Sequence, residues 1–391
     1  MDNLPDEILL TIFDYLPPRI LWSIISKVCR RWKNVVSHRV ITMWDYNKVL
    51  KTHKGVVAIF GIRHQTSRQS PRGLAINFHT LNIRELVLCD NFPLGEMFMK
   101  SVHSIKTLRH LDVFTLQNLH TGYLPPPEVN SIVLNNNIQP GYLLNLARRK
   151  ELKALHMYGR SQYYAVNEMS TMIVIQAKHL THLTLRCPEI SDPRWLVFSQ
   201  CINLLQLQLY ACWSVTANGV AHVLQLPKLQ VLHITGSRMV RITALMELIP
   251  TLSRSIVELN LSASSFSSQH IALLAATLPD LRKMEVWRCD LTAADVLQLA
   301  SGLTKLEDLD TDVELNSVDL MYLSEHPALK ELRCLYEGEI INDELQAQSH
   351  IHVRSALTAP FPLRACGEGP SAGVLLHAHA YKPIDGVTLT I

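Results

Sequence analysis

An apolar pattern that returns about every 25 residues constrains the fold of this chain more than any other feature of its sequence. From residue 83 onward, the arrangement apolar-x-x-apolar-x-apolar occurs eleven times, with starting residues 21 to 28 positions apart. The copies begin at Ile83, Leu108, Val129, Leu152, Leu180, Leu204, Leu229, Ile256, Leu281, Leu306 and Leu329. Each copy has room for one short strand and one return segment, and stacked copies bury their leucines in a continuous core. The pattern therefore predicts a solenoid of parallel strands.

The copy that covers residues 204–229 shows the pattern most clearly. Leu204, Leu207 and Leu209 mark a strand, and Cys212 follows three positions after it. This copy resembles the cysteine-containing subclass of leucine-rich repeats found in F-box proteins, and Cys289 occupies the same position in a later copy. The resemblance implies an α/β solenoid shaped as a horseshoe, with parallel strands on the concave face and helices on the convex face. It also implies that both cysteines support the turn after the strand and have neither a redox nor a metal role.

The first forty residues carry a different pattern. Leu4-Pro5-Asp6-Glu7 is typical of a helix start, and Pro17-Pro18 must end that helix before a second apolar pattern leads to Trp32. Three short helices are expected. A unit of about forty residues buries too little apolar surface to be stable alone, so part of this surface is expected to contact a partner. A helical cap that packs onto the following repeats is the alternative.

The segment that carries the second resemblance reads LPDEILLTIFDYLPPRILWSIISKVCRRWKNVV, and it resembles the F-box. In that family, three helices interlock with an SKP-type adaptor, which in turn holds a cullin scaffold. The resemblance implies a substrate-recognition subunit of an SCF-type ubiquitin ligase, which binds its target through the repeats and has no catalytic centre of its own. The residues implied to face the adaptor or to define the module are Leu4, Pro5, Ile8, Leu9, Leu16, Val28 and Trp32.

These patterns divide the chain into four segments. We expect an F-box over residues 1–45, a linker or degenerate first repeat over 46–82, and the repeats over 83–345. In the linker, the apolar run Val56–Phe60 is strand-like. Residues 346–391 are rich in Pro, Gly, Ala and His and lack the repeat pattern, so a mostly disordered tail is expected, with a closing strand at Val387–Ile391.

Alternation along each strand predicts which side chains face the open concave surface. If the leucines point into the core, large aromatic and charged residues occupy many of the exposed positions. Three aspartates on one strand repel each other unless a basic partner arrives, which favours a target protein with a basic segment. A solvated face that binds nothing is the alternative. The expected substrate-binding residues are Phe114, Tyr158, Arg186, Tyr210, Glu285, Trp287, Asp308, Asp310 and Asp312.

Composition and missing motifs exclude several other functions. A formal charge of +3 over 391 residues, without a basic block, argues against a dedicated nucleic-acid binder. The sequence contains no CxxC pair, GxSxG, HExxH, P-loop or GxGxxG motif, so neither a metal, a cofactor nor an enzyme activity is expected. No apolar run is long enough for a membrane span, and acidic residues follow Met1, so a soluble protein of the cytoplasm, the nucleus or both is expected. A non-degradative scaffold, or a regulator or inhibitor of a partner enzyme, is the alternative function.

Overall fold

The computed structural model divides the chain into two compact units, residues 1–214 and 215–391. The structure describes residues 5, 8–9, 28–32, 41–43, 56–60, 82–87, 102–112, 124–135, 141–149, 151–158, 163–186, 196–210, 221, 223–235, 249–264, 266–336 and 352–355.

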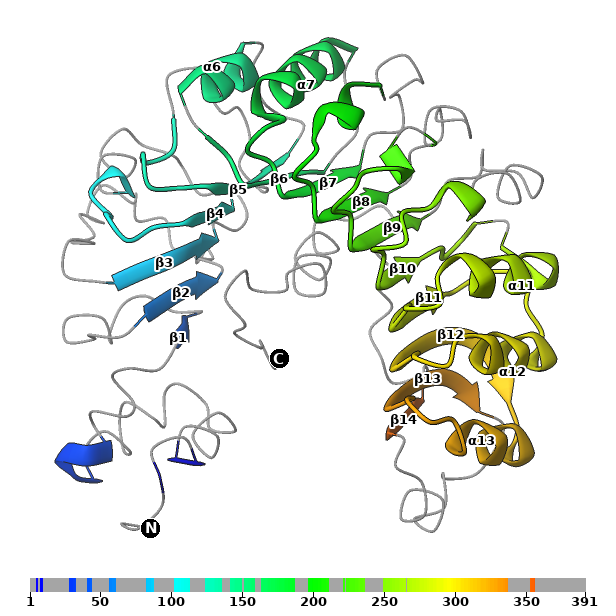
Figure 1. Ribbon diagram of the computed structural model, residues 1–391. Helices are drawn as coiled ribbons and strands as arrows, with labels where there is room; N and C mark the ends of the chain where they lie inside the picture. The colour runs from blue at the N-terminus through cyan, green and yellow to red at the C-terminus, as the bar shows by residue number, and fades with distance from the viewer. Residues whose placement is uncertain are drawn as a thin grey trace, which may run out of the picture. The chain divides into compact units, whose positions relative to one another are not determined.

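In the described part of the first unit, eight strands pair in parallel in the order of the chain (Figure 1). They are β1 (Ile41–Met43), β2 (Val56–Phe60), β3 (Asn82–Val87), β4 (His110–Asp112), β5 (Ser131–Asn135), β6 (Ala154–Tyr158), β7 (His182–Arg186) and β8 (Gln206–Tyr210). The return segments include α6 (Tyr142–Arg149), α7 (Tyr163–Gln176) and the 3-10 helix η5 (Leu196–Gln200). Helices α6 and α7 pack side by side, as the helices of successive repeats do in a solenoid.

The second unit repeats this arrangement. Its strands are β9 (Val231–Thr235), β10 (Glu258–Asn260), β11 (Lys283–Val286), β12 (Asp308–Leu315), β13 (Glu331–Tyr336) and β14 (His352–Ser355), paired in parallel in chain order. The described return segments are η6 (Ile249–Thr251), α11 (Ser268–Thr277), α12 (Ala293–Gly302) and α13 (Ser317–Ser324). Helices α11, α12 and α13 lie on the same side of this sheet (Figure 1).

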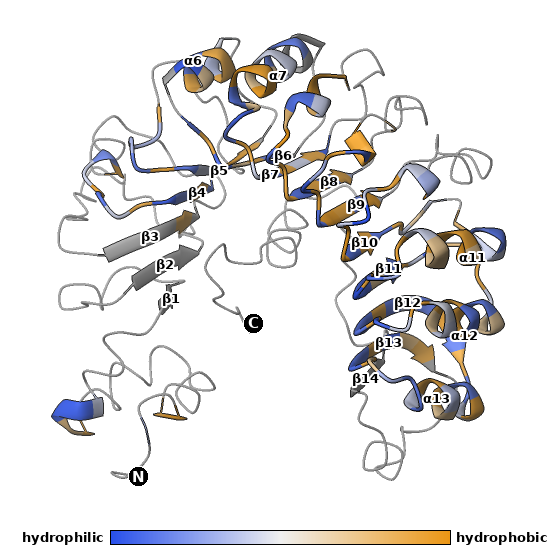
Figure 2. Cartoon of the chain, in the orientation of Figure 1, coloured by the Kyte–Doolittle hydropathy of each residue, from blue (hydrophilic) through white to orange (hydrophobic). Residues whose placement is uncertain are grey.

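The apolar residues that open the predicted repeats form the core. From Leu108 to Leu329, each of them precedes its strand by two residues, and the side chains at these positions are buried. Inside the strands, alternate residues such as Leu259, Met284 and Leu309 are also buried. Figure 2 shows the hydrophobic residues of the second unit on both its strands and its helices, mixed with hydrophilic ones. The predicted α/β solenoid is therefore confirmed, because strand spacing follows the period of the apolar pattern.

Among the described residues, three strands lie outside the eleven predicted repeats. Strand β2 coincides with the strand-like run in the expected linker, and β1 precedes it. Strand β14 pairs with β13 and extends the sheet into the segment that was expected to be mostly disordered. The closing strand expected at Val387–Ile391 lies outside the described residues.

Polar side chains fix the helix starts in the second unit. Thr292 precedes α12, and its hydroxyl accepts a hydrogen bond from the Asp295 N–H at 3.3 Å while the Asp295 carboxylate accepts from the Thr292 N–H at 2.8 Å. Asn316 and Asp319 form the same reciprocal arrangement at the start of α13. These capping boxes satisfy backbone N–H groups that have no partner within the helix. None of the helices in the described ranges is long and apolar enough to cross a membrane.

Candidate protein-binding face

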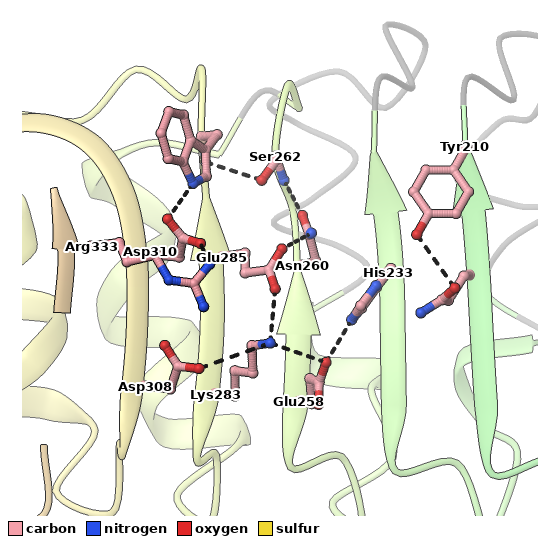
Figure 3. Close-up of polar contacts among 12 residues, drawn as sticks. Tyr210, His233, Glu258, Asn260, Ser262, Lys283, Glu285, Asp308, Asp310 and Arg333 are labelled. Atoms are coloured by element: carbon pink, nitrogen blue, oxygen red, sulfur yellow. Dashed lines mark hydrogen bonds and ion pairs between the residues drawn. The ribbon is translucent and has the colours of Figure 1, made fainter. Parts of the chain in front are cut away.

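Two rows of polar side chains cross the second unit on the side of the sheet opposite its helices. Strand pairing places Glu258, Lys283, Asp308 and Glu331 in one row, and Asn260, Glu285, Asp310 and Arg333 in the next. We call these eight residues, together with Ser262 and Trp287 just beyond β10 and β11 and Asp312 within β12, the polar face. Figure 3 labels all of them except Trp287, Asp312 and Glu331. Neighbouring strands lie about 4.8 Å apart, so each side chain can reach those on the adjacent strands.

Lys283 is the cation at the centre of the first row. Its Nζ atom lies 3.1 Å from Glu285 Oε1, 3.7 Å from Glu258 Oε1 and 3.9 Å from Asp308 Oδ2 (Figure 3). Burial opposes the charged form of this amine, but the three carboxylates outweigh burial and raise the pKa of Lys283 above its usual value. Glu258 is shared, because its Oε1 atom also lies 3.1 Å from His233 Nε2. Lys283 therefore joins three strands through one charge.

Asp310 holds the second row together. Its Oδ2 atom accepts a hydrogen bond from Arg333 Nη1 at 2.7 Å, and its Oδ1 atom accepts one from the indole N–H of Trp287. The residue keeps only 4% of its surface exposed. Burial, together with the charges of Glu285 and Asp308, raises the pKa of Asp310 to about 7, although Arg333 and Trp287 act in the opposite direction.

Just beyond β10 and β11, backbone N–H groups donate hydrogen bonds to side chains of the polar face. The backbone N–H of Trp287 donates to Ser262 Oγ at 3.1 Å, and the backbone N–H of Ser262 donates to Asn260 Oδ1 at 2.9 Å. Asp312 accepts the Arg288 N–H at 3.0 Å and 2.9 Å through its two oxygens. Arg288 has a φ of 52°, in the left-handed region that is unfavourable for a residue with a Cβ atom. Asp312 therefore stabilises a strained turn.

The structure corrects two expectations about this face. Trp287 lies on the predicted side of the sheet, but it keeps only 5% of its surface exposed, so the aromatic ring is not the open anchor that alternation predicted. The repulsion expected among the aspartates is also partly offset by cations of the chain itself, because Lys283 binds Asp308 and Arg333 binds Asp310. The physical reason is the same for both: side chains from neighbouring strands are close enough to cover and pair with one another.

The sequence analysis missed the residues that compensate these charges. Lys283 and Arg333 were not singled out, although each is the register partner of a predicted carboxylate on an adjacent strand, Asp308 and Asp310 respectively. The signal that could have identified both is the opposite charge at the same position of neighbouring repeats. It becomes visible when the copies are aligned in strand register.

In the first unit, a hydrogen-bonded row includes one predicted residue, Tyr210. Its hydroxyl donates to Gln208 Oε1 at 3.3 Å, and the hydroxyl of Thr184 donates to the same oxygen at 3.1 Å. Thr184 also lies 2.8 Å from His156 Nδ1, and since its own proton goes to Gln208, the histidine nitrogen is the donor in that contact. Arg186 is half-buried. Phe114 and the side chain of Tyr158 lie outside the described residues.

The predicted adaptor-binding residues are described only in part. Pro5 is exposed, Trp32 is half-buried and Leu9 is fully buried. Ile8 and Val28 keep 46% and 56% of their surface exposed, which is high for aliphatic side chains. Leu4 and Leu16 lie outside the described residues. The N-terminal segment thus presents apolar side chains to solvent at two of the predicted positions.

Cys289 has the structural role that its repeat position predicted. Its Sγ atom donates to the backbone oxygens of Leu261 at 3.4 Å and Trp287 at 3.6 Å. Burial raises the pKa of the Cys289 thiol to about 11, which keeps it protonated and unreactive at neutral pH. Cys212 lies outside the described residues. Within the described part of the chain, no group of three or more His, Cys, Asp or Glu residues could hold a metal ion.

Comparisons with known proteins agree with both halves of the sequence analysis. Residues 1–44 match the family model for F-box-like domains. Over 158 residues, the chain is 25% identical to F-box/LRR-repeat protein 4 of Bos taurus, in an alignment that covers 39% of this chain and 25% of that protein. The chain thus matches about a quarter of the length of this relative.

Two solved structures are similar to this chain, and the first has a comparable fold. A chain from the crystal structure of the yeast Rad7 and Elc1 complex aligns with 90% of this chain and 88% of its own length, with a TM-score of 0.50 and 12% identity. An internalin of Listeria monocytogenes aligns with 66% of this chain and 73% of its own length, with a TM-score of 0.40 and 16% identity.

Proposed function

We propose that this chain, whose architecture is that of an F-box/leucine-rich-repeat protein, is the substrate-recognition subunit of an SCF-type ubiquitin ligase. Proteins of this type are generally non-catalytic substrate receptors. In the proposal, the N-terminal segment binds an SKP-type adaptor and through it a cullin scaffold, while the repeats bind the target protein. The complex would act in the cytoplasm, the nucleus or both.

The observation that carries this proposal is the combination of an F-box-like segment with exposed apolar side chains and a repeat solenoid behind it. Ile8 and Val28 stay largely exposed in the isolated chain, and exposed aliphatic side chains in a small helical module favour a protein partner. The parallel strands of each unit supply an extended surface, which suits a protein target better than a small substrate.

The mechanism that follows is one of proximity. A receptor that binds the scaffold at one end and the target at the other raises the effective concentration of the target near the ubiquitin-charged conjugating enzyme. No side chain of the receptor has to take part in bond making. Specificity then depends on the surface that binds the target.

A reconstituted ligase tests this function. The full chain is assembled with an SKP-type adaptor, a cullin scaffold and a conjugating enzyme, and ubiquitin transfer to proteins captured by the chain is measured. The wild-type chain should support transfer, and the double variant Leu4→Ala/Pro5→Ala should lose it while still capturing the same proteins. Adaptor binding without any transfer would instead support the non-degradative scaffold.

A further inference from the structure

We propose that the polar face of the second unit binds a basic segment of its partner protein, with a lysine or arginine side chain placed between Asp308 and Glu331. This inference rests on the proposed function only in that the partner would be the target of the ligase. The proposed binding site is the face of β10–β13 opposite the helices, and the proposed ligand is a cationic peptide segment.

The balance of charge on this face favours a cation. On strands β10–β13 its side chains include six carboxylates, on Glu258, Glu285, Asp308, Asp310, Asp312 and Glu331, and two cations, on Lys283 and Arg333; the register continues the two rows to His352 and Arg354 on β14. Both cations already have carboxylate partners, since Lys283 is shared among three carboxylates and Arg333 is bound to Asp310. A face with this excess of negative charge attracts positively charged segments and repels acidic ones.

Two of these carboxylates face each other on neighbouring strands. Asp308 and Glu331 are direct register partners on β12 and β13, so two carboxylates stand opposite each other across neighbouring strands. Like charges in that arrangement destabilise a sheet. The Nζ atom of Lys283 lies 3.9 Å from Asp308 Oδ2 and is closer to both Glu258 and Glu285. A cationic side chain between Asp308 and Glu331 would remove this repulsion.

The hydrogen bonding of Asp308 points to the same position. Its Oδ1 atom is buried and has no hydrogen-bond partner among the described residues. Burial and the charges of Glu331 and Glu285 raise the pKa of Asp308, while Lys283 and Arg333 act against them. An acceptor without a donor is costly, and if the carboxylate turns toward the surface, an ammonium or guanidinium group of the partner would supply both an N–H and a positive charge.

The test uses the full chain and a fluorescein-labelled peptide of alternating arginine and serine, about ten residues long so that it can span several strands. Binding is followed by fluorescence anisotropy at low and high salt. A peptide of the same length with glutamate in place of arginine serves as the charge control. We expect the arginine peptide to bind, its affinity to fall as salt increases, and the glutamate peptide not to bind.

The decisive variant is Asp308→Asn/Glu331→Gln, which keeps side-chain size and removes two charges from the proposed site. Its matched control is Asp280→Asn/Glu325→Gln, which removes two charges from exposed positions at the ends of α11 and α13. The first variant should bind the arginine peptide roughly tenfold more weakly, and the control should bind it within about twofold of wild type. If the double variant does not fold, Glu331→Gln alone decides, because it removes one of the two charges and keeps side-chain size.

Equal weakening in both double variants, or tighter binding of the glutamate peptide, would overturn the proposal. So would a complete lack of binding by the arginine peptide. Adaptor binding through the N-terminal segment is measured separately in the same preparations. A chain that binds the adaptor but not the arginine peptide would contradict this inference and leave the proposed ligase function in place.

Discussion

At the scale of single residues, Lys283 is the charge on which the polar face depends most. Its amine contacts Glu258, Glu285 and Asp308, and about a fifth of its side chain is exposed. Removing one partner from a largely buried ionic cluster leaves the other charges uncompensated. We expect Lys283→Met to lower the free energy of unfolding by about 2 kcal/mol, measured by urea denaturation. Lys305→Met, which removes an exposed pair with Asp280, should cause no measurable change.

The raised pKa of Asp310 predicts that the free energy of unfolding depends on pH. Its pKa rises from 3.8 to about 7 on folding, so the native state binds its proton more tightly than the unfolded state does. The resulting stabilisation is fully present below pH 3.8 and is lost as the pH rises to about 7, with a slope of at most about 1.4 kcal/mol per pH unit. Asp310→Asn lacks this titration. The difference in unfolding free energy between wild type and variant should therefore change between pH 4 and 7, and parallel pH profiles would contradict the assignment.

At the scale of secondary-structure elements, the capping boxes make the helices of the second unit start at defined residues. Thr292→Ala removes the hydroxyl that accepts the Asp295 N–H and donates to the Asp295 carboxylate at 2.7 Å. We expect this variant to lower the free energy of unfolding by about 1 kcal/mol. Ser301→Ala, near the other end of α12, removes only an exposed bond to the Gln298 carbonyl and should have a much smaller effect. Equal losses would show that the cap is not the stabilising feature.

The strands were predictable from the sequence, whereas the arrangement of polar side chains was not. Periodicity places Leu281 and Leu306 two residues before β11 and β12, because the core needs one apolar residue at that position in every repeat. Periodicity along the chain does not reveal that the polar residues of neighbouring strands bind one another. Two examples are the pairs Lys283–Glu258 and Trp287–Asp310, whose members are 25 and 23 residues apart and are brought together only by strand register.

Two strands were missed for a different reason. Strands β1 and β14 lie where the apolar pattern is too short or too irregular to be found by its period. Strand β14 includes His352 and Arg354, yet it pairs in register with β13 through its backbone. Backbone hydrogen bonding to an existing strand edge depends little on side-chain type, so such strands are not visible in a hydrophobic pattern.

At the scale of the whole molecule, the chain combines a small N-terminal segment with exposed aliphatic side chains and two units built from parallel-strand repeats. The two parts are expected to bind their partners independently. A change at Val28 should affect adaptor binding alone, and a change at Asp308 should affect peptide binding alone, because each acts through its own surface. Substitutions at both positions should have independent effects on the two binding free energies.

The most direct test of the account is the affinity of the full chain for a purified SKP-type adaptor, measured by isothermal titration calorimetry. The wild-type chain should bind, and Val28→Lys, which places a charge at an apolar position of the proposed interface, should weaken binding at least about tenfold. The matched control is Val318→Lys on α13, where the valine keeps 73% of its surface exposed, and it should bind like wild type. A wild-type chain that does not bind the adaptor, or a Val28→Lys chain that binds it unchanged, would contradict the account.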